Sequence, residues 1–182
     1  VAGWSERYRK ARTPDVPDAE AVMAWLAAEQ PPDVATVVIH NDFRFDNLVL
    51  DPTDPTRIVG VLDWELATVG DPLMDLGSAL AYWVQADDDY VMQRMRRQPT
   101  HAPGMLTRAE VVERYTERAG LVVSPERWRF YEVFGLFRLA VIAQQIYYRF
   151  VHGQTTNPAF AEFGAAVAYL DHRSRSILEG RG

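Results

Sequence analysis

The chain has 182 residues, 48% of them hydrophobic, which is enough to bury a core and to form one domain. Its net charge of -6 argues against nucleic acid as a partner, because phosphate backbones favour clusters of Lys and Arg. It contains no cysteine, which excludes disulfides, zinc thiolate sites and iron–sulfur clusters and fits a cytoplasmic protein.

The chain carries no signal for a membrane or for export. No apolar run reaches the ~18 residues of a membrane span, and the first seven residues lack the apolar segment of a signal peptide. We therefore expect no membrane partner. Because the chain starts at Val1 instead of Met, we interpret it as a fragment or a processed product.

The first half of the chain predicts one helix followed by short strands. Pro17 and Asp18 are typical of a helix start, and β-branched runs further on indicate strands. A segment rich in Asp and Pro, residues 51–56, predicts a turn between two of these strands. The predicted elements are a helix over residues 17–29, a buried strand over 34–39 and strands over 48–50 and 58–62.

The second half predicts helices. Asp71-Pro72 is a favourable start, Thr107 to Glu110 forms a capping box, and Gly153 is a typical stop. The three acids at 87–89 are expected to form a solvated helix start. The predicted helices cover residues 71–84, 87–97, 107–120, 124–152 and 157–178. The fold class is therefore α+β and mainly helical, with a small β patch that carries polar motifs.

Two short motifs follow the predicted strands. Residues 40–47 read H-x-D-x-x-x-x-N, and Asp63 ends the third strand. Asp42 could orient the proton of a substrate hydroxyl. Asn47 could return with its amide oxygen beside Asp42 and share one sheet edge with Asp63. Oxygen ligands of this kind suit Mg²⁺, whereas zinc would need more His or Cys. An acid, an amide and a second acid are the set that phosphoryl transfer requires.

Each of these residues has a simpler interpretation. Asp42, Asn47 and Asp63 could each be a turn residue, because Asp and Asn favour strand ends. Their combination in one compact unit, at a phosphotransferase spacing, favours the functional interpretation.

Four further residues accompany the motifs. His40 is expected to be a hydrogen-bonded core residue that shapes the loop, although a ligand or base is the alternative. Arg44 could contact phosphate or substrate, or pair with Asp46. Glu65 could touch Mg²⁺ or substrate, or be a surface acid. Asp75 could reach back to hold the loop, or add negative charge to a helix start.

These motifs resemble those of the aminoglycoside phosphotransferase and choline kinase-like superfamily, whose fold is a variant of the protein kinase fold. Residues 40–47 look like its catalytic loop, residues 60–65 like its metal-binding segment, and residues 70–77 like the helix start that follows. Residues 3–8 and 158–178 look most like the branch found beside or fused to acyl-CoA dehydrogenases.

The resemblance implies a role for each matching residue. Asp42 would be the catalytic base, Asn47 and Asp63 would bind Mg²⁺ and through it ATP, and Asp75 would brace the loop. The chain departs from the family at Asn41, where Gly is common. That departure costs backbone freedom but removes no chemical group.

The resemblance covers the C-terminal lobe only. The chain has no G-x-G-x-x-G or G-K-[ST] motif, and its single lysine, Lys10, lies outside any predicted strand. We therefore expect residues 1–182 to form a single catalytic and substrate-binding domain without the N-terminal nucleotide-binding lobe. Such a lobe alone should bind nucleotide poorly and be inactive.

The leading hypothesis is an ATP- and Mg²⁺-dependent O-phosphotransferase that acts on a small-molecule hydroxyl. The family offers aminoglycosides, choline-like amines, sugars or hydroxyacyl-CoA thioesters as acceptors, and the dehydrogenase-associated branch favours the last. Two alternatives stay open, a non-catalytic kinase-like module for binding or oligomerisation and a metal-dependent phosphohydrolase. An exposed face in place of the missing lobe could also drive homo-oligomerisation.

Overall fold

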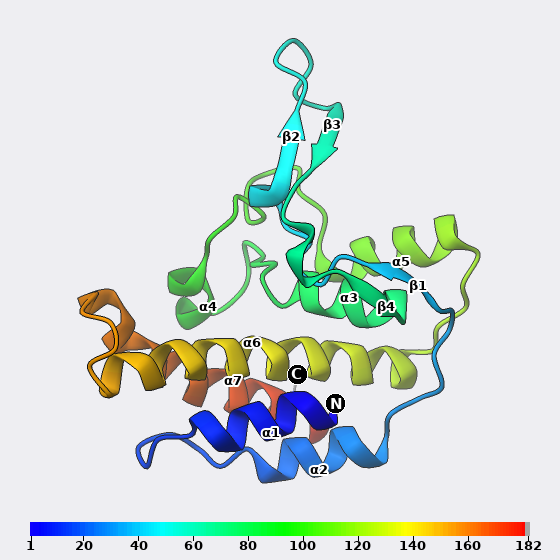
Figure 1. The fold of residues 1–182 in the computed structure, drawn as a ribbon. Coiled ribbons are helices and arrows are strands. Elements are labelled where there is room, and N and C mark those ends of the chain that lie inside the picture. The colour runs from blue at the N-terminus through cyan, green and yellow to red at the C-terminus, as the bar shows by residue number, and fades with distance from the viewer. Residues whose placement is uncertain (181–182) are drawn as a thin grey trace. The chain divides into compact units, whose positions relative to one another are not determined.

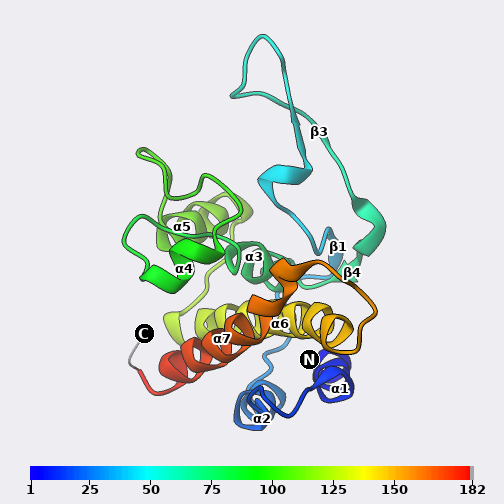
Figure 2. The ribbon, with the colours of Figure 1, turned by 90° about the vertical axis from the view of Figure 1, so that its left-hand side faces the viewer.

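The computed structural model describes residues 1–180, which divide into two compact units (Figures 1 and 2). Unit 1 combines residues 1–31 with the residues from 125 onward, and unit 2 is the stretch between them, residues 32–124. The model is mainly helical with a few short strands, as the sequence predicts.

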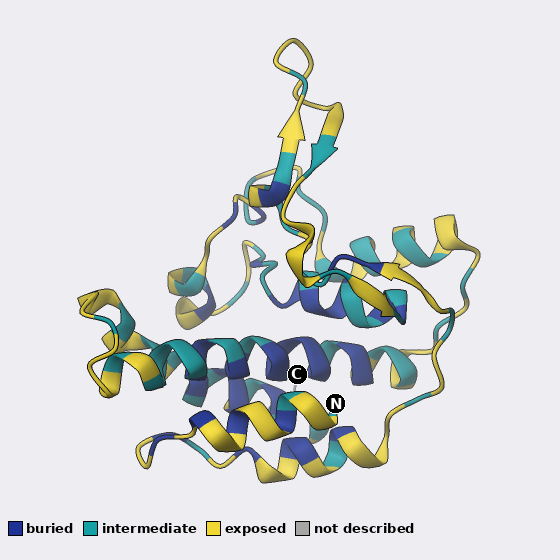
Figure 3. Cartoon of the chain, viewed as in Figure 1, coloured by how far each residue is buried: buried dark blue, intermediate teal, exposed yellow. Residues whose placement is uncertain are grey.

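Unit 1 is a helical bundle organised around one long helix, α6. Helices α1, α2 and α7 each contact α6, and its middle is buried (Figure 3). Four aromatic side chains of this helix lie in the core, namely Phe130, Tyr131, Phe134 and Phe137. The helices of unit 1 are α1 (Ala2–Ala11), α2 (Glu20–Ala28), α6 (Pro125–Val151), the 3-10 helix η3 (Pro158–Glu162) and α7 (Phe163–Leu178).

The ends of these helices follow local signals, with one error in the prediction. Gly153 closes the region after α6 in a left-handed conformation with φ 67°, as expected of a glycine stop. Helix α2 starts at Glu20 and not at Pro17, because Ala19 has φ 54° and the Asp18 carboxylate accepts the backbone N–H of Glu20 at 3.1 Å. The helix therefore starts later than the pattern of Pro17 and Asp18 indicates, with Ala19 as its N-cap.

Unit 2 contains two separate two-stranded antiparallel sheets. In the first, Val37 pairs with Gly70 and Ile39 with Thr68; in the second, Leu48 pairs with Val61. The strands of unit 2 are β1 (Val37–Ile39), β2 (Leu48–Leu50), β3 (Ile58–Val61) and β4 (Thr68–Gly70). Its helices are η1 (Phe45–Asn47), η2 (Trp64–Leu66), α3 (Pro72–Leu80), α4 (Tyr90–Met95) and α5 (Arg108–Ala119).

The first strand is shorter and more exposed than predicted. It begins at Val37, and Val38 keeps 67% of its surface accessible, whereas the sequence predicts a buried strand from residue 34. The physical reason is that β1 pairs only with β4, and only Ile39 at its end is buried.

The β2–β3 hairpin extends away from the helices of unit 2 (Figures 1 and 2). Asp51 and Asp54 hold its turn, because their carboxylates accept the hydroxyls of Thr53 and Thr56 at 2.7 and 2.6 Å. The turn therefore forms where the sequence predicts it. None of the helices over residues 1–180 is long and apolar enough to cross a membrane.

Candidate active site

The loop over residues 40–47 connects β1 to β2 in unit 2 and brings Asp42 and Asn47 together. Asn47 is buried, and its Nδ2 donates to the backbone oxygen of Asp42 at 2.7 Å and to the carboxylate Oδ2 at 3.3 Å. Because the amide nitrogen is used in these contacts, the amide oxygen Oδ1 faces away from Asp42. The loop therefore doubles back as the motif spacing predicts, but the amide nitrogen and not the predicted amide oxygen lies beside Asp42, because both Asp42 atoms in this contact are hydrogen-bond acceptors.

His40 is buried and fixes the start of this loop. Its Nδ1 accepts the backbone N–H of Asp42 at 3.2 Å, and its Nε2 lies 2.8 Å from the backbone oxygen of Leu62. These contacts assign the ring proton to Nε2, which donates to Leu62. The imidazole also packs against Trp64, with ring centroids 4.7 Å apart. His40 thus ties the loop to the end of β3, in keeping with a structural role.

Asp75, in the first turn of α3, binds the backbone of the loop. Its Oδ2 accepts the N–H of His40 at 2.7 Å, and its Oδ1 accepts the N–H of Asn41 at 2.8 Å. Asp71 caps the same helix by accepting the N–H of Leu73 at 2.8 Å. Hydrogen bonds to a charged acceptor are stronger than neutral ones, so one carboxylate holds two consecutive loop amides in place.

Asn41 adopts a left-handed backbone conformation, with φ 65°. Few residues other than Gly and Asn tolerate this region, because a Cβ atom crowds the following carbonyl. The side chain of Asn41 also contributes, since its Nδ2 donates to the backbone oxygen of Leu66 at 3.0 Å. Asparagine therefore provides both the turn and a tie to η2 that glycine could not make.

Asp63 lies directly after β3, and the pairing of the hairpin sets its position. The backbone oxygen of Asn47 accepts the N–H of Leu62 at 2.8 Å, so Asp63 follows the residue opposite Asn47. Asp63 has φ 66°, and its exposed carboxylate has no hydrogen bond or ion pair within residues 1–180. Glu65 is also exposed.

The predicted single sheet edge is wrong. Asp42 follows β1 in one sheet, whereas Asn47 and Asp63 flank β2 and β3 in the other. The loop from His40 to Asn47 crosses between the two sheets, and the hydrogen bonds of Asn47 and His40 bridge them. The strands are too short to form one continuous sheet, so side-chain contacts join the parts instead.

Arg44 lies beside Asp42 and Asp46. Its Nε is 3.5 Å from Asp42 Oδ1, and its Nη1 is 3.9 Å from Asp46 Oδ2. Its guanidinium carbon lies 5.1 Å from the ring centroid of Tyr82. Arg44 therefore contacts both acids, and the nearer of them is Asp42.

The acids at the start of α3 shift the pKa of one nearby residue, Tyr115. Burial raises the pKa of the Tyr115 phenol, and the negative charges of Asp75 and Asp71 raise it further. Tyr115 therefore stays a neutral phenol beside the acids that begin α3. Over residues 1–180 there is no cluster of three His, Asp or Glu side chains that could hold a metal by themselves. A cation here would need the amide of Asn47 or a ligand's oxygens to complete its shell.

Comparison with known proteins decides the family. The family model described as "Phosphotransferase enzyme family" matches residues 1–131. The chain belongs to this phosphotransferase family. A crystal structure of a candidate aminoglycoside phosphotransferase from Ralstonia eutropha JMP134 is similar over 98% of this chain and 54% of that chain, with a TM-score of 0.81 and 28% identity. The fold is therefore that of the kinase-like phosphotransferases.

Two animal proteins that are similar to this chain are named as acyl-CoA dehydrogenase family members. Acyl-CoA dehydrogenase family member 10 of Mus musculus is 34% identical over 90% of this chain and 15% of that protein. Acyl-CoA dehydrogenase family member 11 of Homo sapiens is 31% identical over 86% of this chain and 20% of that protein. The chain thus spans about half of the similar solved structure and a fifth or less of these two proteins. Both findings agree with the resemblance noted in the sequence.

The sequence analysis missed three residues that contact the loop over residues 40–47. Gln98 Oε1 accepts the N–H of Phe45 at 2.8 Å, and Trp83 packs edge to face on Phe45 with centroids 5.4 Å apart. Tyr82 faces Arg44. Gln98 is buried in an irregular segment, where a glutamine gives no local signal. These contacts join residues far apart in sequence, so no local pattern indicates them.

Proposed function

We propose that this chain carries the catalytic loop of an ATP- and Mg²⁺-dependent O-phosphotransferase that acts on the hydroxyl of a small molecule. The observation that carries the proposal is the Asn47–Asp42 contact within the H-x-D-x-x-x-x-N loop, held by Asp75 in a chain of the phosphotransferase family. A carboxylate beside an amide, with a second acid nearby, suits this reaction.

In this proposal, Asp42 orients the attacking hydroxyl and accepts its proton. Asp42 is only partly buried, so its carboxylate is reachable by a substrate. The residue next to it in space, Arg44, supplies a positive charge that a transferred phosphoryl group could meet. Glu65 is the further candidate for a contact with substrate.

The donor set fits magnesium. Asn47 uses its Nδ2 toward Asp42, which leaves the amide oxygen for a cation, and Asp63 offers a carboxylate without another partner over residues 1–180. Both are hard oxygen donors of the type Mg²⁺ prefers, and Mg²⁺ commonly completes its shell with water and phosphate oxygens. When bound, Mg²⁺ would neutralise charge on the nucleotide phosphates.

The acceptor we favour is a hydroxyl on an acyl thioester of the hydroxyacyl-CoA type. Its support is the similarity to acyl-CoA dehydrogenase family members 10 and 11, with which this chain aligns over most of its length. Aminoglycosides, choline-like amines and sugars are the competing acceptors. A metal-dependent phosphohydrolase is the competing reaction, and it would release phosphate from a substrate without ATP.

Calorimetric titration with MgATP tests the nucleotide part of the proposal. The titration is run on residues 1–182 and on a version of the protein extended upstream of Val1. Binding by the longer version supports the kinase and justifies an acceptor screen. Absence of binding by both would favour the non-catalytic module.

The base assignment is tested in whichever version transfers phosphate. Asp42→Asn keeps the size of the side chain and should lower transfer by roughly 10²- to 10⁴-fold, because general base catalysis typically contributes that much. Asp46→Asn is the matched control, since Asp46 is an exposed acid in the same loop. Equal activity of the two variants would exclude Asp42 as the base.

A further inference from the structure

Arg44 is held loosely by the acid it faces. The 3.5 Å between its Nε and Asp42 Oδ1 is longer than the 2.7–2.9 Å of a strong charged hydrogen bond. Its Nε is buried and has no hydrogen-bond partner. Arg and carboxylate groups prefer a close, two-pronged pairing, so something else must determine where this guanidinium lies.

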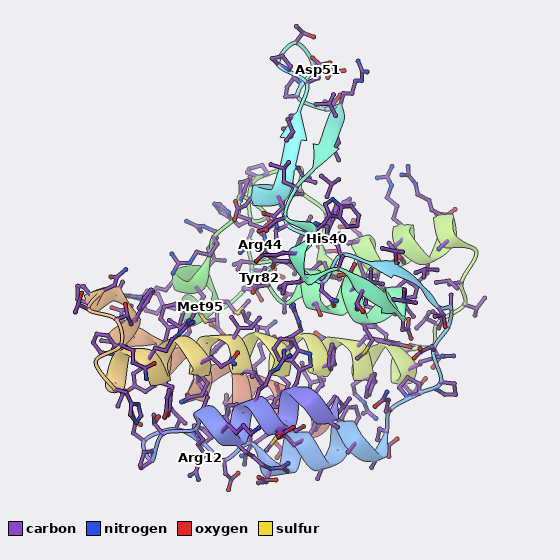
Figure 4. All side chains as sticks on the ribbon, viewed as in Figure 1. Arg12, His40, Arg44, Asp51, Tyr82 and Met95 are labelled. Carbon is purple, nitrogen blue, oxygen red and sulfur yellow. The ribbon has the colours of Figure 1, made fainter. Side chains whose placement is uncertain are left out.

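Tyr82 is the group that lies against it. The guanidinium carbon of Arg44 is 5.1 Å from the Tyr82 ring centroid, within range of a cation–π contact (Figure 4). An aromatic face attracts a cation without using its N–H donors. The contact therefore places the guanidinium without using any of its N–H donors.

The placement of Tyr82 follows from the helix that also braces the loop. Asp75 lies in the first turn of α3, and Tyr82 follows seven residues later, just beyond the end of the helix. Tyr82 lies in the turn that ends the helix, where its backbone N–H donates to the backbone oxygen of Ala79 at 3.2 Å. Asp75 thus binds the loop backbone at His40, and Tyr82 faces its side chain at Arg44.

Neighbouring contacts limit the movement of both partners. Phe45 is held by the edge-to-face contact with Trp83 and by the hydrogen bond from its N–H to Gln98. Trp83 is itself fixed, since its Nε1 donates to the backbone oxygen of Leu106 at 2.9 Å. Phe45 and Trp83, which follow Arg44 and Tyr82 in the sequence, are therefore both anchored in unit 2.

We propose that Tyr82 is a positioning residue that holds the Arg44 guanidinium beside Asp42 and prevents it from closing onto that carboxylate. This inference deepens the proposed function and rests on it for its catalytic meaning. Without the ring, Arg44 would pair closely with Asp42 and occupy the base, or turn to Asp46. With the ring, an acid and a cation stay side by side and both remain available to substrate.

The test uses NMR on the labelled 182-residue chain and needs no turnover, so it stands even if phosphoryl transfer is not found. In the wild-type chain, the Arg44 side-chain protons should show the upfield displacement of a group over an aromatic face. Tyr82→Leu should abolish that displacement and change the ¹³C shift of the Asp42 carboxylate. Tyr82→Phe keeps the ring and should preserve both signals.

Tyr90→Leu is the matched control, because Arg94 lies 6.0 Å from the exposed ring of Tyr90 in the same unit. This variant should leave the Arg44 and Asp42 signals unchanged. The indole N–H signal of Trp83 reports whether unit 2 stays folded in each variant. The proposal is overturned if wild-type Arg44 shows no upfield displacement, a result that needs no variant to fold. It is equally overturned if Tyr82→Phe changes the signals as much as Tyr82→Leu, or if neither changes them.

Discussion

Asn47 donates from one nitrogen to two oxygens of Asp42, the backbone carbonyl at 2.7 Å and the carboxylate at 3.3 Å. The contact fixes which end of the buried amide faces Asp42 and which end is left for another ligand. The candidate base and the candidate metal ligand of the loop therefore also fix each other's position.

Replacing that amide tests this mutual support. Asn47→Asp replaces the donor by an acceptor and places two carboxylates against each other, whereas Asn47→Ala removes the whole amide. We expect Asn47→Ala to lower the free energy of unfolding by about 1–3 kcal/mol, the usual cost of unsatisfied buried partners. Asn47→Asp should lower it more, because like charges are then close. Urea titration followed by tryptophan fluorescence measures both, and an Asp variant as stable as the wild type would contradict the contact.

The two hydrogen bonds that Asp75 accepts predict how fast the individual loop amides exchange with solvent. Asp75→Ala removes both acceptors, so the amide protons of His40 and Asn41 should exchange with solvent faster by a similar factor. Asp75→Asn retains one acceptor oxygen, so only one of the two amides should lose protection. Hydrogen exchange measured by NMR distinguishes these outcomes. Unchanged protection of both amides in Asp75→Ala would show that the brace is not needed.

Two substitutions of Asn41 separate what its side-chain hydrogen bond contributes to stability from what its left-handed backbone conformation costs. Asn41→Gly keeps the backbone conformation and loses only the hydrogen bond to Leu66. Asn41→Ala loses the same bond and in addition pays about 1–2 kcal/mol for φ 65° with a Cβ atom. Chemical denaturation should therefore rank wild type and Gly above Ala. Equal stabilities for Gly and Ala would mean that the loop relaxes to another conformation.

Asp171 in unit 1 makes the stability depend on pH. Burial raises the pKa of its carboxyl group from the ordinary 3.8, although the Arg175 guanidinium opposes the rise. The folded state therefore holds this proton more tightly than the unfolded state does. The resulting stabilisation is complete below pH 3.8 and is lost as the pH rises through the raised pKa of the folded state.

Asp171→Asn should remove this loss of stability with rising pH, since an amide does not ionise. Thermal unfolding at several pH values above 4 should show a smaller decline in Tm for the variant than for the wild type. Arg175→Gln serves as the opposite control, because loss of the opposing cation should raise the pKa further and steepen the decline. A decline of the same slope in all three proteins would show that Asp171 does not control it.

Local signals made part of this structure predictable. The helix α5 begins at the predicted capping box, in which Thr107 and Glu110 bond to each other's backbone, and it ends at Gly120 with φ 64°. Such caps depend on residues four or fewer apart, so the sequence contains all of their parts. The return of Asn47 to Asp42 is local in the same sense, since a loop of five residues closes it.

Features that join distant residues were not predictable in this way. Strand β4 was missed, because three residues without a period show no strand signal until β1 pairs with them. Asp88, expected to be solvated, is nearly buried and forms a two-pronged ion pair with Arg108 at 2.7 Å. Sequence reasoning also gives no reason to place Tyr82 against Arg44. In each case the partner lies many residues away.

The division into two units has a consequence for how the protein is made. Unit 2 is encoded within unit 1, so a ribosome releases α1 and α2 long before the α6 on which they pack. At synthesis rates of about 5–20 residues per second, these two helices wait for roughly 5–20 seconds with their apolar faces uncovered. Unit 2 has no such delay and can fold as it emerges. The loop over residues 40–47 can therefore form before α1 and α2 meet the helix on which they pack.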